Sequence, residues 1–219
     1  MTRIVIAGGH GQIALLLAAR LSADGHTVQG LLRRPDGADD LVAAGAEPVV
    51  LDLERASAQE LAEVIRGADA VVFAAGAGPG SSAERKYAVD LGGSVLLADA
   101  AELAGVPRFV QVSSMGAGAP AADDSDPVWV AYLDAKTKAE DDLRRRDLDW
   151  TIVRPGGLLN TPGLGLVHLA AHTGRGTVPR ADVADVLAEL IEQGTASRQT
   201  LELVSGSVPI FSAVQAWKV

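Results

Sequence analysis

The spacing of one tyrosine and one lysine in this sequence is that of a possible catalytic pair. Tyr132 and Lys136 are four residues apart in a segment with helical periodicity, so they share one face of a helix. Ala135, Ala139 and Leu143 continue that face, which turns both polar groups toward the protein interior. A phenol beside an ammonium could donate a proton to a carbonyl, and the lysine could hold a ribose. The alternative is a packed tyrosine with a lysine that extends to solvent.

Two serines complete this candidate catalytic group. Ser113 and Ser114 follow an apolar run that predicts a strand, and either hydroxyl could hydrogen-bond the same carbonyl. A serine-hydrolase turn is excluded, because Gly-x-Ser-x-Gly would need glycine at position 112, where valine stands. His168 and His172 would form a metal-binding pair only on a helix, but residues 165–169 alternate like a strand, so we expect no metal site.

A glycine-rich turn near the N-terminus predicts a dinucleotide site. Its spacing is Gly8-x-x-Gly11-x-x-Ala14, between an apolar strand and an amphipathic helix. A pyrophosphate would bind the free amides at the positive end of that helix. The expected contacts are Gly8, Gly9, His10, Gly11, Gln12 and Ile13. A plain tight turn is the alternative, and the Lys-Ser/Thr of a P-loop is missing.

Two arginines favour NADP over NAD. Arg33 and Arg34 end the second predicted strand, 19 and 20 residues past Ala14. NAD-binding folds carry a carboxylate near this point for the ribose 2′-hydroxyl, whereas arginine suits a 2′-phosphate. An exposed basic turn would look the same in sequence. Further cofactor contacts are expected where the next two strands end, at Asp52, Leu53, Ala74, Ala75 and Gly76.

The elements that must position these residues alternate between strand and helix. Strands are predicted at Arg3–Ala7, Thr27–Leu32, Glu47–Asp52, Ala70–Ala74, Arg108–Ser113, Trp150–Arg154 and Thr200–Val204. Helices are predicted at Gly11–Ala23, Gln59–Arg66, Glu84–Ala104, Val128–Arg146, Ala181–Gln193 and Ile210–Trp217. Nearly continuous apolar strands are typical of a sheet covered on both faces. The sequence therefore predicts a doubly wound parallel α/β fold with three layers, α/β/α.

Loops are expected at Gly76–Ser82, Gly116–Asp126 and Arg154–Gly176, all after the carboxyl ends of predicted strands. We expect residues 1–219 to form one dinucleotide-binding domain whose small substrate pocket is built from these loops. A homodimer could form through the long helices.

The charge and the amino-acid composition limit which classes of binding partner are expected. The net charge of −9 argues against nucleic acid and anionic membranes, so a small-molecule substrate is expected. The chain has no cysteine, which excludes disulfides and thiolate chemistry. No export signal is evident, and we expect a cytoplasmic protein.

These motifs together resemble the atypical short-chain dehydrogenases/reductases, in the compact NAD(P)H-binding group related to epimerase/dehydratase and NmrA-like proteins. The resemblance rests on the glycine turn, Val112–Ser114, Tyr132–Lys136, Leu148–Gly156 and Arg180–Ala184. It implies a Rossmann fold and makes Tyr132 and Lys136 the active-site pair. It also implies that Val153, Arg154, Pro155 and Gly156 lie near the nicotinamide. Asp90 stands where such folds often have asparagine.

Three functions follow as expectations. The first is an NADP(H)-dependent oxidoreductase acting on a small carbonyl or quinone-like substrate. The second is a non-catalytic NADP(H)-binding regulator that senses redox state. The third is epimerase or dehydratase chemistry on a nucleotide sugar, which needs more substrate-binding chain than follows Arg154.

Overall fold

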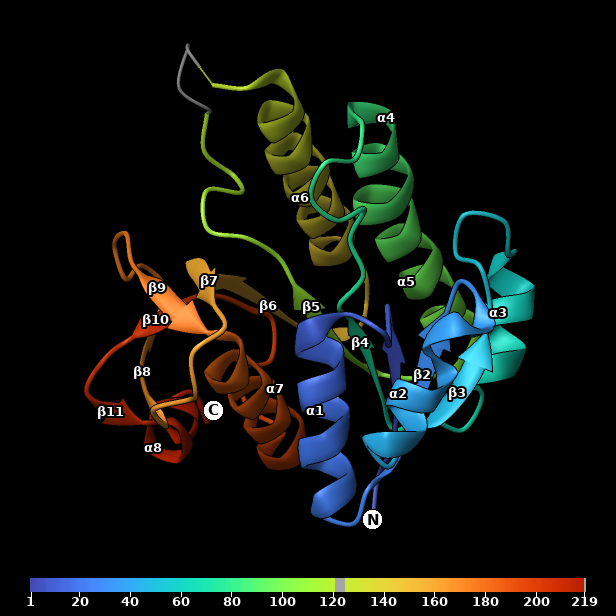
Figure 1. Cartoon of the computed structure of the whole chain (residues 1–219), viewed down its shortest axis with the longest axis horizontal. Helices are drawn as coiled ribbons and strands as arrows, with labels where there is room; N and C mark the ends of the chain where they lie inside the picture. Colours follow the sequence, from blue (N-terminus) through green and yellow to red (C-terminus); the bar gives the residue numbers. More distant parts are fainter. Residues whose placement is uncertain (121–124, 219) are drawn as a thin grey trace.

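A computed structural model describes residues 1–120 and 125–218 of the chain. A nine-stranded sheet runs through it, in the order β11-β8-β10-β6-β5-β4-β1-β2-β3 (Figure 1). Its parallel strands are β1 (Arg3–Ala7), β2 (Thr27–Leu32), β3 (Glu47–Val50), β4 (Ala70–Phe73), β5 (Arg108–Val112), β6 (Asp149–Pro155) and β10 (Gln199–Ser205). All seven strands expected from the sequence are present, with ends within one or two residues, and the doubly wound prediction is confirmed.

The strand order reverses direction between β1 and β4, and this reversal creates the ligand crevice. Chain connections leave β1 toward β2 on one side and return to β4 on the other, so the loops at the carboxyl ends of β1 and β4 part. Open α/β sheets bind ligands at such a point. The glycine turn follows β1, at this position.

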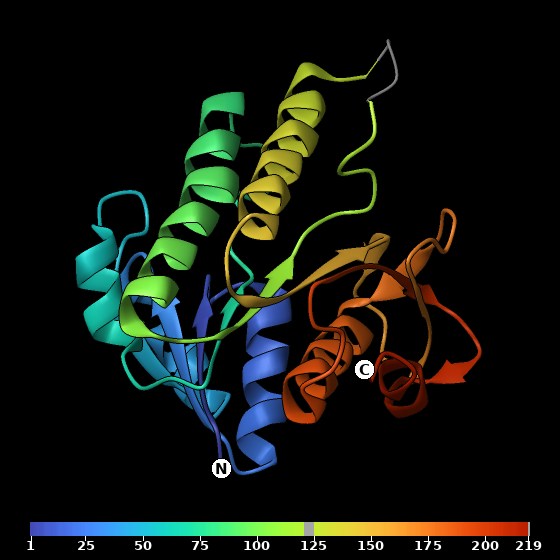
Figure 2. The same cartoon turned by 180° about the vertical axis from the view of Figure 1, so that it is seen from behind.

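Helices cover both faces of the sheet (Figure 2). One face carries α1 (Gln12–Ala23), α2 (Ala38–Ala43), α7 (Arg180–Gln193) and α8 (Ile210–Gln215), and the other carries α3 (Ala58–Ile65), α5 (Gly93–Ala104) and α6 (Pro127–Arg144). Each face packs its own aliphatic core, because alternate residues of the buried strands point to opposite faces. The result is the three-layer arrangement that the sequence predicts.

The helix expected over Glu84–Ala104 is interrupted. A short α4 (Ala83–Arg85) leads into a π-helical segment, η2 (Lys86–Gly92), before α5 begins. Wider π-helical turns are frequent at functional sites, because they shift side chains that a regular helix would place elsewhere. Lys86 and Asp90 belong to this segment, and both are buried.

The prediction of a loop over Arg154–Gly176 is wrong. It contains β7 (Gly157–Leu159) and β8 (Leu166–Ala170), which pair with β9 (Thr177–Pro179) and β10. β8 has the alternating burial of a half-covered strand, and β11 (Val208–Pro209) adds to its edge. The alternation of residues 165–169 is visible in the sequence, but the glycines and prolines around the other short strands favoured a loop.

Of the other expected loops, Gly76–Ser82 is irregular chain, and Gly116–Asp126 includes residues 121–124, which lie outside the described residues. In the part of the chain that the structure describes, no helix combines the length and apolarity needed to cross a membrane.

Candidate functional site

Two cavities adjoin where the strand order reverses. The first, of about 370 Å³, lies beside the turn after β1 and the ends of β2 and β3. The second, of about 740 Å³, lies between the ends of β5 and β6, the segment η2 and the start of α6. Ala74, Ala75 and Gly76, which follow β4, line both cavities. The two cavities are therefore neighbouring parts of one cleft, a shape suited to a two-part ligand.

The glycine turn is held tightly by backbone packing. Gly8 has φ +83°, and a Cβ there would lie 2.5 Å from Cα of Ala75, so only glycine fits. The amide of Gly9 donates to the carbonyl of Leu31 at 2.9 Å, and a Cβ at Gly9 would meet Cα of Gly30 at 2.8 Å. The turn thus ties the end of β1 to β2 and brings the chain close to β4.

The N-terminus of α1 lies between the two cavities. Gly11 is its N-cap and gives no side-chain cap, and the first turn has no acidic residue. Gly11 lines the first cavity and Ile13 lines the second. Uncapped amides at the positive end of a helix attract anions. These residues fit a dinucleotide. Its pyrophosphate would bind this helix end, its adenine half would lie in the first cavity and its nicotinamide half in the second.

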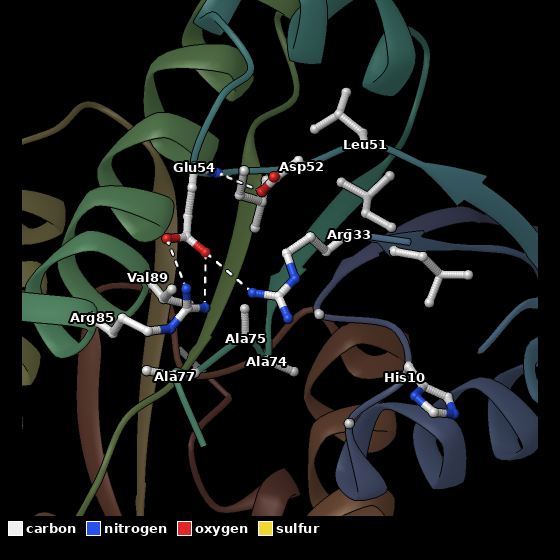
Figure 3. Close-up of a pocket in the computed structure, with 16 residues that line it drawn as sticks. His10, Arg33, Leu51, Asp52, Glu54, Ala74, Ala75, Ala77, Arg85 and Val89 are labelled. Carbon is white, nitrogen blue, oxygen red and sulfur yellow. Dashed lines mark hydrogen bonds and ion pairs between the residues drawn. The ribbon is translucent and has the colours of Figure 1, made fainter. Parts of the chain in front are cut away.

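An acidic side chain bridges two arginines at the first cavity (Figure 3). Glu54 accepts a hydrogen bond from Arg85 Nη2 at 2.8 Å and one from Arg33 Nη1 at 3.4 Å. Asp52 supports the same loop by accepting a hydrogen bond from the amide of Glu54 at 3.0 Å. Arg34 is 65% exposed and pairs with Asp36 at 3.5 Å. Only the first of the two expected arginines lines the cavity.

Tyr132 and Lys136 meet at the second cavity. The Lys136 ammonium is 3.2 Å from Asp90 Oδ1, donates to the carbonyl of Val112 at 3.2 Å, and lies 5.8 Å from the centre of the Tyr132 ring. Asp90 also accepts a hydrogen bond from the amide of Ala77 at 3.0 Å. Lys136 and Asp90 are buried, whereas Tyr132 is partly exposed at the cavity wall. The buried lysine therefore has the partner that its burial requires.

The two serines behave differently. Ser113 donates to the fully buried carboxylate of Glu140 at 2.5 Å, so its hydroxyl is committed to the interior. Ser114 is partly exposed at the second cavity, and among the described residues its hydroxyl makes one long contact, of 3.3 Å, with the carbonyl of Met115. Of the two, Ser114 has the hydroxyl that is free to meet a ligand.

Glu140 also holds two arginines. Arg154 donates to it from Nε at 2.9 Å and from Nη2 at 2.5 Å, and Arg144 donates at 2.7 Å. Burial alone would lower the pKa of Arg154, but the hydrogen bonds and charge of Glu140 outweigh it and raise that pKa. This network fixes α6 against β6 behind the cavity.

Comparison with known proteins bears on this cleft. Residues 8–194 match the model of a protein family described as NAD(P)H-binding. The chain belongs to the NAD(P)H-binding family. Its curated relatives include an uncharacterized sugar epimerase, YhfK, of Bacillus subtilis, which is 35% identical over 97% of this chain and 99% of its own length.

Solved structures of the NAD(P)H-binding fold agree with this assignment. A protein of Bacillus halodurans named for NAD-dependent epimerase/dehydratase proteins superposes with a TM-score of 0.91, at 35% identity, over 99% of this chain and 100% of its own. ChuY of Escherichia coli O157:H7, titled an anaerobillin reductase, has a TM-score of 0.80 at 25% identity, over 94% of this chain and 98% of its own. The family thus includes oxidoreductase-like and epimerase-like proteins.

Within this NAD(P)H-binding chain, most of the expected site residues come together. Those lining the first cavity are Gly8, His10, Gly11, Arg33, Asp52, Leu53, Ala74, Ala75 and Gly76. Those lining the second are Ile13, Ala74, Ala75, Gly76, Ser113, Ser114, Tyr132, Lys136, Pro155 and Gly156. Those lining neither are Gly9, Gln12, Arg34, Val153 and Arg154. Val153 is a core residue of β6, and Arg154 is bound by Glu140.

Sequence reasoning missed several residues of the cleft. These are Glu54, Arg85, Lys86, Trp129 and Arg180. An available signal was the position of Trp129 three residues before Tyr132, which places both rings on one face of α6. Among residues 1–120 and 125–218, no group of three or more His, Asp or Glu side chains is arranged to hold a metal ion.

Proposed function

We propose that this protein is an NADPH-dependent reductase of a conjugated carbonyl or quinone-like acceptor. The observation that carries the proposal is the position of Tyr132 and Ser114. Both line the cavity that begins at Ile13, in the first turn of α1, and Lys136 lies beside them. A proton donor and a hydrogen-bond donor therefore adjoin the site suited to the reacting half of a dinucleotide.

Preference for NADPH over NADH is supported by the charges at the first cavity. Two guanidinium groups, Arg33 and Arg85, share one carboxylate, Glu54. A 2′-phosphate could take the place of Glu54 between them, because phosphate oxygens accept paired hydrogen bonds from arginine. The 2′-hydroxyl of NADH would not replace that carboxylate.

The chain's own residues then have separate tasks. When bound, NADPH would supply the acceptor carbon with a hydride and its electron pair. Tyr132 donates its hydroxyl proton to the acceptor oxygen, and Ser114 donates a hydrogen bond to the same oxygen. Lys136 is held in place by Asp90, and its Nζ lies 5.8 Å from the centre of the Tyr132 ring, where it would help to orient the tyrosine and the ribose beside it. Tyr132 regains a proton from water, because it is partly exposed.

The wall of the second cavity favours an acceptor with an apolar body. It is lined by Val128, Trp129, Pro79 and Leu158, of which all but Val128 are exposed. The similarity to ChuY, which is titled a reductase, supports reduction of an organic acceptor.

The experiment is an acceptor screen that follows the loss of NADPH absorbance as the cofactor is oxidised. Menadione, an aromatic aldehyde and a flavin represent the acceptor classes. Saturable NADPH oxidation with menadione or the aldehyde is the expected result, with slower turnover of NADH. Tight NADPH binding with no oxidation by any acceptor would contradict the proposal and support the redox-sensing alternative.

A further inference from the structure

A second ammonium group lies at the Tyr132 ring, and no carboxylate of the described residues pairs with it. Lys86, the first residue of η2, is 8% exposed, and its Nζ is 5.3 Å from the centre of that ring. Within residues 1–120 and 125–218 it donates one hydrogen bond, to the carbonyl of Gly78 at 2.7 Å. Lys136, on the same ring, has Asp90 at 3.2 Å, whereas no carboxylate within residues 1–120 and 125–218 forms an ion pair with Lys86.

A buried ammonium with one neutral acceptor is an energetically incomplete arrangement. An ammonium has three donors, and burial removes the water that would otherwise satisfy them. Lys86 lines the second cavity, so its unused donors have access to whatever binds there. An anionic group on the bound molecule would satisfy both the charge and the donors.

The remaining charges of the second cavity also favour an anion. Its described lining holds three cationic side chains, Lys86, Lys136 and Arg180, and two carboxylates, Asp90 and Asp126, a net charge of +1. Both carboxylates are already engaged. Asp90 pairs with Lys136, and Asp126 caps α6 by accepting from the amides of Val128 and Trp129 at 2.8 and 3.1 Å.

Arg180 adds a second cation whose partner is neutral. It is the first residue of α7, and its Nη1 donates to the amide oxygen of Asn160 at 2.6 Å. A surplus of positive charge here stands out in a chain whose net charge is −9. Local positive charge in an acidic protein concentrates anionic ligands at that position.

An aromatic surface lies next to these cations. The rings of Trp129 and Tyr132 are 5.2 Å apart between centres and tilted by 33°, and both line the cavity. Trp129 is 47% exposed, so its face is available to a ligand. A flat conjugated molecule can pack on such a ring, and its acidic substituent would then lie near an ammonium.

We propose that the substrate of this site is a planar, conjugated carboxylate whose ring packs on Trp129 and whose carboxylate binds Lys86. The proposal rests on the proposed reductase function and narrows its substrate class. The cofactor phosphates are not the anion concerned. Lys86 lines only the second cavity, whereas the preceding Arg85 lines the first, and the helix end suited to pyrophosphate is that of α1.

The test compares two small probes of the same shape and different charge. Isothermal titration calorimetry measures binding of 2-naphthoate and of neutral 2-naphthamide to the NADP⁺-loaded protein and to the cofactor-free protein. Three variants are titrated beside the wild type: Lys86→Met, Lys86→Arg and Lys138→Met. Lys138 is a matched control on α6, since it is 56% exposed, pairs with Asp134 and lies outside the cavity lining.

The wild type should bind 2-naphthoate about tenfold more tightly than 2-naphthamide, the ratio expected for one hydrogen-bonded charge pair. Lys86→Met should abolish this ratio, while Lys86→Arg and Lys138→Met should keep it. Equal affinities for the two probes, no saturable binding of 2-naphthoate, or an unchanged ratio in a folded Lys86→Met protein would overturn the proposal. Because the probes are also titrated without cofactor, a failure to bind NADP⁺ would count against the proposed function alone.

Discussion

The ammonium of Lys136 lies 3.2 Å from Oδ1 of Asp90, and both side chains are buried beside the second cavity. The two residues come from different elements, α6 and the π-helical segment η2. The pair therefore joins the helix that carries Tyr132 to the segment that carries Lys86. Asp90 also binds the amide of Ala77, in the loop shared between the two cavities. One ion pair thus sets the positions of several parts of the cleft.

Replacing Asp90 by asparagine should destabilise the fold, because the Lys136 ammonium would be buried without a counter-charge. We expect the free energy of unfolding to fall by about 3 kcal/mol, as for other broken buried ion pairs. Urea unfolding measures this loss. The double variant Asp90→Asn, Lys136→Met should recover part of it, because no uncompensated charge remains. A loss below about 1 kcal/mol in the single variant would show that the pair is not held as ions.

Removing the Tyr132 hydroxyl should stop proton transfer without disturbing the cofactor. Tyr132→Phe is expected to lower kcat about 100-fold or more, while the Kd for NADPH stays within about twofold. Tyr87→Phe is the control, since Tyr87 is the other tyrosine of the chain and its hydroxyl binds Asp134 at 2.6 Å outside the cavity. Equal turnover in wild type and Tyr132→Phe would remove Tyr132 from the mechanism.

Substitutions of the two adjacent serines should affect different quantities, protein stability for Ser113 and turnover for Ser114. Ser113→Ala leaves the buried Glu140 with one hydrogen bond fewer, and we expect a loss of about 2 kcal/mol in unfolding free energy with little change in kcat. Ser114→Ala should instead lower kcat about tenfold with little change in stability. Thermal unfolding and steady-state kinetics on both variants check this. The reverse pattern would mean that Ser113 turns toward the ligand during the reaction.

The adjacent residues Arg33 and Arg34 should differ in their effect on cofactor binding. Arg33→Ala should weaken NADPH binding about tenfold and leave NADH binding unchanged, because only NADPH has the 2′-phosphate. Arg34→Ala should affect neither, since Arg34 pairs with Asp36 and does not line the first cavity. Fluorescence titrations of the wild type and the two variants with both cofactors measure the six dissociation constants. Equal weakening of NADPH and NADH by Arg33→Ala would refute the 2′-phosphate contact.

The surface contact between Tyr87 in η2 and Asp134 in α6 should stabilise the fold by an amount that depends on pH. Hydrogen bonds from Lys138 and Tyr87 lower the pKa of Asp134, so its stabilisation is present above the unfolded-state pKa of about 3.9 and is lost as the pH falls through the lower folded-state value. Its side chain is 38% exposed, and water screens the contact to about 0.5 kcal/mol. Urea unfolding of Asp134→Asn should show this deficit at neutral pH and a progressively smaller one as the pH falls below about 3.9. A deficit that persists in acid would contradict it.

The fold was largely predictable because its strands are buried on both faces. Runs such as Ala70–Phe73 have no polar residue, and each is followed by a helical pattern, so the order of elements could be read directly. The π-helical segment could not be predicted, because a change from i+4 to i+5 hydrogen bonding leaves no mark in the apolar pattern of residues 84–104. The short strands of the C-terminal part are masked by their glycines and prolines.

The site was predictable where local sequence determines it. The glycine turn and the Tyr132–Lys136 spacing are contained in a few residues. The bridge between Arg85 and Glu54 joins positions 31 apart in the chain, and the contact from Ser113 to Glu140 joins positions 27 apart. Which of two adjacent serines faces the ligand depends on how the end of β5 meets α6, because successive side chains point to opposite faces. None of these three relations can be predicted from the sequence before the topology is known.

The central claim is that the uncapped N-terminus of α1 binds the cofactor pyrophosphate, which places the reacting half beside Tyr132. A crystal structure of the protein with NADP⁺ tests it most directly. We predict pyrophosphate density against the backbone at Gln12 and Ile13. We also predict that the nicotinamide lies in the second cavity, beside the side chain of Tyr132. Density that lies away from the Gly8–Ile13 turn, or a nicotinamide that points out of the second cavity, would contradict the claim.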